Sequence, residues 1–76
     1  MEDEELTELR QNLGQEIREA RQLAGISQED LALMADIDRS YVSQLERGIA
    51  NPSLLILHRL AKVLKSELYV TIRNVG

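Results

Sequence analysis

The side chains of this sequence that could do chemistry are hydrogen-bonding groups rather than catalytic groups. No nucleophile has a basic partner nearby in the sequence, no glycine-rich phosphate loop is present, and cysteine is absent. His58 is the single histidine, so we interpret it as a partly exposed helix residue rather than a metal ligand. Arg39 and Gln44 can bond the edges of guanine and adenine, respectively, with two hydrogen bonds each. We therefore expect a binding protein, with no enzymatic activity, no metal and no cofactor.

The elements that must position these side chains lie in residues 27–48, where the sequence predicts two short helices joined by a tight turn. Ser27 is a suitable N-cap because an acid, Asp30, follows three residues later. After the turn, Asp38 caps a second helix that runs through Arg47. Such a pair has helix-turn-helix geometry, in which the first helix crosses the DNA backbone and the second enters the major groove.

Further helices flank this motif on both sides. Apolar residues at helical spacing predict an amphipathic helix from about residue 4 to 24, with Gly14 inside it at a cost of about 1 kcal/mol relative to alanine. A fourth helix begins at Asn51-Pro52-Ser53 and runs to about Lys65. Its apolar arc is about 180° wide, whereas covering one core needs about 100°. We therefore expect it to contact a partner chain as well, through Leu55, Ile56 and Val63.

The C-terminal segment, residues 66–76, changes to a strand pattern. Three apolar residues, Leu68, Val70 and Ile72, alternate with polar or amphipathic ones. A lone strand cannot satisfy its backbone, and the chain has no other strand candidate, so we expect pairing with the same segment of a second copy. A short fifth helix or a frayed tail is the alternative. The expected fold is all-α, a compact four- to five-helix domain over residues 1–65, followed by this dimerisation strand or tail.

Composition and charge are compatible with a single cytoplasmic domain. The 76 residues are 43% hydrophobic and 29% charged, which suits a globular chain, and no apolar run approaches the length of a membrane span. The first residues are acidic and no apolar region follows them, so we expect no signal peptide. The net charge of −4 divides unevenly, because residues 1–36 hold ten acids and three Lys/Arg, whereas residues 37–76 hold three acids and six Lys/Arg. The second half can therefore meet phosphates.

Several motifs keep a fixed order and spacing over about residues 13–65. They read Ile17-Arg18-x-x-Arg21-x-x-x-Gly25-x-Ser27-Gln28-x-x-Leu31-Ala32, then Ser43-x-Leu45-Glu46-x-Gly48, then Asn51-Pro52-Ser53, and finally Leu57-x-x-Leu60-Ala61-x-x-Leu64. This arrangement closely resembles the phage repressor and Cro family, also called the XRE family. The resemblance implies a sequence-specific DNA-binding transcriptional regulator, most simply a dimeric repressor.

The resemblance also implies roles for single residues. Base edges would be read by the exposed face of the recognition helix 38–47, at Arg39, Ser40, Ser43 and Gln44. Phosphates would be met by Ser27, Gln28, Tyr41, Arg47 and Asn51, although Tyr41 can equally pack beside the turn. Gln28 would also buttress the recognition helix. Arg21 and Glu46 resemble the internal ion pair of the family, which links the first helix to the recognition helix.

The expected partners are double-stranded DNA and a second copy of the chain. Two-fold symmetry would place two recognition helices about 34 Å apart on a pseudo-palindromic operator. The tail from Leu64 to Ile72 resembles that of HipB-type antitoxins, so a toxin or another protein partner is an alternative. A restriction-modification controller protein and a pure protein-interaction domain are further alternatives. The loop 48–51 lacks the additional Lys or Arg of many family members, which predicts a shallow salt dependence of DNA binding.

Overall fold

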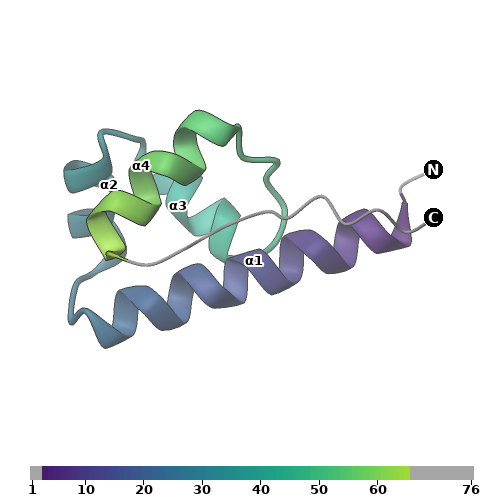
Figure 1. Cartoon of the computed structure of the whole chain (residues 1–76), viewed down its shortest axis with the longest axis horizontal. Coiled ribbons are helices and arrows are strands. Elements are labelled where there is room, and N and C mark those ends of the chain that lie inside the picture. Colours follow the sequence, from purple (N-terminus) through teal and green to yellow (C-terminus); the bar gives the residue numbers. More distant parts are fainter. Residues whose placement is uncertain (1–2, 66–76) are drawn as a thin grey trace.

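The structure, a computed structural model, describes residues 3–65 and contains four α-helices within that range. In chain order, and as labelled in Figure 1, these are α1 (Glu4–Leu23), α2 (Gln28–Ala35), α3 (Arg39–Glu46) and α4 (Leu54–Leu64). The all-α helix-turn-helix fold predicted from the sequence is therefore confirmed. The predicted dimerisation strand, with Leu68, Val70 and Ile72, lies outside the described residues.

Each helix starts at a polar side chain that accepts a hydrogen bond from a free backbone N–H of the first turn. Asp3 does so for α1, and Asp38 accepts from the N–H of Ser40 for α3. Ser27 and Asp30 form a reciprocal capping box at α2, with bonds of 3.0 and 3.2 Å. Ser53 caps α4 by accepting from the N–H of Ile56. The helix starts predicted from the sequence are thus set by local chemistry.

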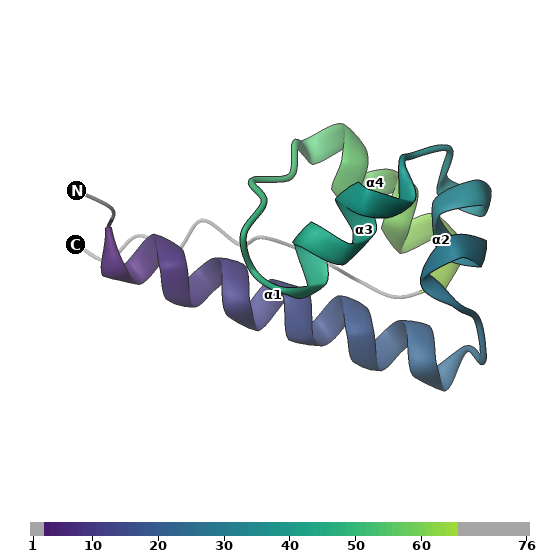
Figure 2. The same ribbon diagram turned by 180° about the vertical axis from the view of Figure 1, so that it is seen from behind.

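Eleven buried apolar residues of the described range form one core between the helices. Ile17 of α1, Leu31 of α2, Val42 and Leu45 of α3 and Leu60 of α4 are almost completely buried at its centre. The long α1 lies along one side of the molecule and packs on α3, and the shorter helices gather on the other side of it (Figures 1 and 2). α2 contacts both α3 and α4, so both helices of the helix-turn-helix pair pack on the same hydrophobic core.

Gly14 has a packing role that the sequence pattern did not predict. The glycine is buried in α1, and a Cβ atom added there would lie 2.3 Å from the carbonyl oxygen of Leu45 and 2.8 Å from that of Glu46. The missing side chain lets α1 approach the C-terminal end of α3 backbone to backbone. Gly14 therefore does more than weaken the helix, because it sets the distance between α1 and α3.

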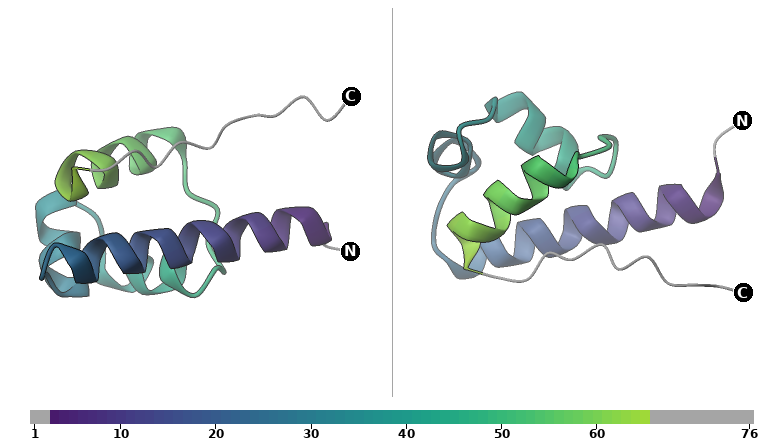
Figure 3. Two further views of the ribbon diagram at one scale, coloured as in Figure 1. Left: turned by 60° about the horizontal axis from the view of Figure 1, so that its bottom comes forward. Right: turned by 45° about the horizontal axis from the view of Figure 1, so that its top comes forward.

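Apolar side chains remain uncovered at several places within residues 3–65, including the N-terminal part of α1 and the start of α4. The N-terminal part of α1 extends past the other helices (Figure 3), and there Leu6 and Leu9 are 41% and 46% exposed. On α4, Leu55 is 57% exposed, whereas Ile56 and Val63 are half-buried. No helix within residues 3–65 is long and apolar enough to cross a membrane.

Candidate nucleic-acid interface

The turn between α2 and α3 holds the two helices in a fixed relation. Asp36 adopts a left-handed conformation with φ of 57°, and the N–H of Ile37 donates to the carbonyl of Ala32 at 2.9 Å. Ala32 and Ala35 are buried, so no large side chain separates the helices here. Asp38 then starts α3 in a new direction. The turn thereby produces the geometry that the sequence predicted for residues 27–48.

The outer face of α3 carries the predicted base-reading side chains. Arg39, Ser40 and Gln44 are exposed, and Ser43 is half-buried. A surface hollow lies in front of α3. It is lined by the N-cap of α3, three residues of α3 and the first residue of α2, which are Asp38, Arg39, Ser40, Ser43 and Gln28. A convex helix that presents Arg and Gln outward beside such a hollow has the shape and the donors needed to read the major groove.

Asp38 and Ser40 form a small polar cluster at the exposed N-terminal end of α3. The backbone N–H and the hydroxyl of Ser40 both donate to the Oδ1 of Asp38, each at 2.9 Å. These two hydrogen bonds, the backbone bond first, lower the pKa of Asp38 below its ordinary value. The Ser40 hydroxyl oxygen still has lone pairs with which to accept a hydrogen bond from a base, and its own hydrogen is directed to Asp38.

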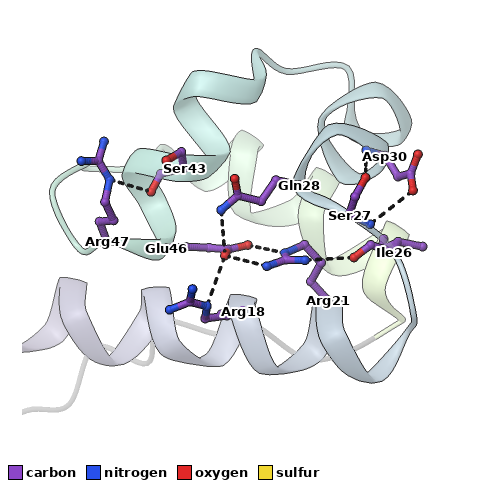
Figure 4. A network of polar contacts seen from close by, with 9 residues as sticks. All are labelled: Arg18, Arg21, Ile26, Ser27, Gln28, Asp30, Ser43, Glu46 and Arg47. Carbon is purple, nitrogen blue, oxygen red and sulfur yellow. Dashed lines mark hydrogen bonds and ion pairs between the residues drawn. The ribbon is translucent and has the colours of Figure 1, made fainter.

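Behind this face, the carboxylate of Glu46 joins three elements (Figure 4). The side chain of Glu46 is only 2% exposed. Its Oε2 accepts from Arg21 Nε at 2.6 Å, and its Oε1 accepts from Arg21 Nη2 at 3.1 Å. Arg21 Nη1 donates to the carbonyl of Ile26 at 3.0 Å. Arg21 and Glu46, predicted as a structural pair, therefore connect α1 to the end of α3 by a two-point contact of the kind that Arg forms best.

Gln28 belongs to the same network. Its Nε2 donates to Glu46 Oε1 at 3.1 Å, from the first residue of α2 to the last residue of α3. The hydrogen bond that Arg21 of α1 donates to Glu46 raises the pKa of Arg21 above its ordinary value, so the guanidinium stays charged. An amide nitrogen has two hydrogens, and the second one of Gln28 is not used by Glu46. The network thus fixes the side chain of Gln28 at the edge of the hollow in front of α3.

Arg18 is a member of this network that the site prediction did not include. Its Nε lies 3.9 Å from Glu46 Oε1, and its side chain is 55% exposed. Figure 4 shows its guanidinium reaching from α1 toward the end of α3. Arg18 stands one helical turn before Arg21, a spacing that puts both on the same face of α1, and this was the signal in the sequence. Arg18 adds positive charge beside the predicted phosphate contact Gln28.

The remaining predicted phosphate contacts lie around the ends of the motif. Ser27 is occupied as the N-cap of α2, and its contribution to DNA binding would come from the free N–H groups of that helix start. Tyr41 is half-buried and donates from its hydroxyl to the carbonyl of Asn51 at 3.3 Å. The side chain of Asn51 accepts from Arg10 Nη1 at 3.0 Å. Tyr41 thus contacts the loop that follows α3, and its phosphate contact stays a prediction.

Arg47 is exposed just beyond α3. Its Nε donates to the carbonyl of Ser43 at 3.4 Å, which leaves the outer nitrogens of the guanidinium directed away from the helix (Figure 4). Gly48 follows with φ of 75° and ends the helix; a Cβ there would lie 2.9 Å from the Cγ of Gln11 in α1. The chain can therefore turn sharply after Arg47 only with glycine at this position.

Comparison with known proteins agrees with this geometry. The model of a helix-turn-helix family matches residues 17–70. An uncharacterized HTH-type transcriptional regulator of Methanothermobacter thermautotrophicus is 41% identical over 51 residues, which are 67% of this chain and 74% of that protein. Control protein C.BamHI of Bacillus amyloliquefaciens is 40% identical over 52 residues, covering 67% of this chain and 64% of that protein. The crystal structure of the restriction-modification controller protein C.AhdI from Aeromonas hydrophila superposes with a TM-score of 0.75 at 44% identity, over 78% of this chain and 89% of that one.

Proposed function

We propose that this chain binds a pseudo-palindromic operator as a homodimer and represses transcription by occupying it. The chain belongs to the XRE-type helix-turn-helix family of DNA-binding transcriptional regulators. The observation that carries the proposal is the outer face of α3, where Arg39, Ser40 and Gln44 are exposed and the first two of them line the hollow. Arg and Gln bond guanine and adenine in the major groove with two hydrogen bonds each, and one such pair contributes about 1–3 kcal/mol of discrimination.

In this mechanism the two helices of the motif have separate tasks. α3 enters the major groove and reads base edges, while the N-terminal end of α2 meets the sugar-phosphate backbone. Free N–H groups at the start of α2 and the second amide hydrogen of Gln28 would donate to phosphate oxygens. Glu46 holds both helices in register through Arg21 and Gln28. No chemistry is performed, because occupancy of the operator is sufficient to exclude polymerase.

A homodimer is supported by the size of the chain and by its uncovered apolar residues. A domain of this length buries only about 60% of the surface that its unfolded chain exposes, so a second copy would add stability. Leu55 on α4 is exposed, and Ile56 and Val63 are half-buried along the same helix. Two-fold symmetry would then present two α3 helices to successive major grooves about 34 Å apart.

The proposal is tested by selecting binding sites from random duplex DNA at low salt. The wild-type chain should enrich a palindromic site with two half-sites about one helical turn apart. The Arg39→Ala/Gln44→Ala variant should lose that enrichment. A matched control is Lys62→Ala/Gln15→Ala, since both residues are exposed and lie on α4 and α1. Equal enrichment by all three proteins, or no enrichment by a folded wild-type dimer, would contradict readout by α3.

A role as a restriction-modification controller is the second candidate, and a specific observation favours it. C.AhdI and C.BamHI are a structural neighbour and a relative of this chain, at 44% and 40% identity. A controller can activate as well as repress. Measuring transcription from a promoter that carries the selected site distinguishes a repressor from a controller. A repressor lowers the amount of transcript at every protein concentration, whereas an activating controller raises it over some range of protein concentration.

A further inference from the structure

An apolar groove runs between the N-terminal half of α1 and the start of α4. We call it the α1–loop groove, and its lining consists of Leu6, Leu9, Arg10, Leu13, Asn51, Pro52 and Leu57. Leu13 and Leu57 form its floor, since both are buried, and Leu6 and Leu9 are its exposed wall. Of the residues predicted to face DNA, only Asn51 belongs to this lining, and its side chain is bonded to Arg10. An occupant of the groove would therefore leave the outer face of α3 free.

We propose that the C-terminal segment of this chain, residues 66–76, docks in the α1–loop groove of the same molecule. Its apolar residues alternate, so in an extended conformation Leu68, Val70 and Ile72 share one face and Tyr69 and Thr71 the other. Such a segment presents a single apolar ridge with a polar back. A narrow apolar groove with an exposed leucine wall is the complement of that ridge.

The reach of the segment agrees with docking in the same molecule. In Figures 1 and 3, α4 ends close to the C-terminal end of α1. The groove lies toward the other end of α1, because the residues of α1 that line it lie between Leu6 and Leu13. Along α1, at 1.5 Å per residue, Leu13 and Leu6 lie about 15 and 26 Å from Leu23. An extended chain rises about 3.3 Å per residue, so Leu68 and Ile72 would lie about 10 and 23 Å beyond Lys65. The apolar ridge and the groove therefore cover overlapping ranges.

Docking would also account for the length of α1. Leu6 and Leu9 are 41% and 46% exposed although they continue the apolar stripe that Leu13 and Ile17 bury in the core. Covering this stripe with Leu68, Val70 and Ile72 removes apolar surface from water, which is the main favourable contribution to such packing. The outward edge of the docked segment would still be free to pair with a second copy.

Disulfide trapping tests the proposal directly, because the chain has no cysteine of its own. Leu9→Cys is combined in turn with Leu68→Cys, Val70→Cys or Ile72→Cys, so that the result does not depend on one register. The control pairs Leu33→Cys with the same three positions, since Leu33 is 74% exposed on α2 and outside the groove. All variants are oxidised as full-length chains and analysed by non-reducing gels and mass spectrometry.

Docking predicts an intramolecular disulfide in at least one Leu9 variant, formed at least about tenfold faster than in the matching Leu33 variant. Equal rates for the two series would overturn the proposal, and so would disulfides that link two chains, because they would assign the groove to the partner's segment. A second measurement is amide hydrogen exchange over residues 6–13 in the Val70→Asp variant. Docking predicts faster exchange there than in wild type, whereas unchanged exchange would contradict it.

Discussion

Arg21→Ala should destabilise the fold strongly, because it leaves the buried carboxylate of Glu46 without its main partner. The substitution removes two hydrogen bonds to Glu46, of 2.6 and 3.1 Å, and one to the carbonyl of Ile26. Stranding one partner of a buried ion pair costs about 3–5 kcal/mol. Gln28 and Arg18 remain near the carboxylate, at 3.1 and 3.9 Å, so we expect the lower end of this range, about 3 kcal/mol.

A loss of this size is a large part of the total stability. At about 0.05–0.15 kcal/mol per residue, a chain of 76 residues has a free energy of unfolding of about 4–11 kcal/mol. Because 1 kcal/mol shifts the melting temperature of such a domain by about 4–8 °C, Arg21→Ala should lower it by about 12 °C or more. The matched control is Arg18→Ala, whose side chain is 55% exposed and whose loss should cost less than about 1 kcal/mol.

Urea unfolding followed by circular dichroism measures these free energies, and thermal melts measure the melting temperatures, both at constant protein concentration. Glu46→Gln and the double variant Arg21→Ala/Glu46→Gln complete a double-mutant cycle. The double variant should cost less than the sum of the single ones, because it no longer contains a stranded charge. An Arg21→Ala midpoint equal to wild type, or additive costs in the cycle, would refute the account of Glu46 as the junction of α1, α2 and α3.

Three other predictions follow from the geometry. Gly14→Ala should destabilise the chain by about 1–3 kcal/mol despite alanine's better helix propensity, because its Cβ would lie 2.3 Å from the carbonyl oxygen of Leu45. The control Asn12→Ala, on the exposed side of α1, should be neutral or slightly stabilising in the same thermal melts. The pKa of Asp38 is lowered in the folded state, so the carboxylate stabilises the fold above its ordinary pKa of 3.8, and this stabilisation is lost as the pH falls through the lower pKa of the folded state. Between about pH 5 and 3, the melting temperature of Asp38→Asn should therefore decline less steeply than that of wild type. Arg47→Ala should weaken binding to all DNA sequences alike and reduce the slope of log affinity against log salt by about 0.9, measured by fluorescence anisotropy, whereas an unchanged slope would remove Arg47 from the phosphate contacts.

The helix positions were predictable from the sequence because their signals are local. Ser27 with Asp30 and the N-cap Asp38 act within one helical turn, and the structure starts α2 and α3 immediately after these caps. Gly25 and Gly48 have positive φ values of 73° and 75°, as expected of residues that end helices. Local hydrogen bonding and local backbone conformation thus determine most of the element boundaries.

Contacts between distant segments were predictable only through the family resemblance or not at all. The pairing of Arg21 with Glu46 spans 25 residues and came from the resemblance. The close approach of Gly14 to the end of α3 and the participation of Arg18 depend on the angle at which α1 crosses α3. The residue pattern of a single helix does not determine that crossing angle, so these roles can be recognised only in the packed structure.

For the predicted site, the structure shows where the side chains lie rather than which groups of the DNA they contact. It places Arg39, Ser40 and Gln44 on an exposed face, as predicted, and it places Gln28 beside them. For Tyr41 the sequence left two roles open, a phosphate contact and packing beside the turn; the structure shows its hydroxyl bonded to the carbonyl of Asn51, and the phosphate contact stays a prediction. Contacts with bases and phosphates stay predictions, because side-chain chemistry alone does not fix the sequence or the shape of the DNA.

The most direct test of readout by α3 is the base-by-base specificity of Arg39→Ala compared with wild type, measured on single-substitution variants of the selected site. Base readout by Arg39 predicts that discrimination falls by about 1–3 kcal/mol at one base pair in each half-site, related by the two-fold axis, and stays unchanged elsewhere. A uniform loss of affinity over all sites, with discrimination intact at each base pair, would show that Arg39 contacts the backbone and would contradict the account.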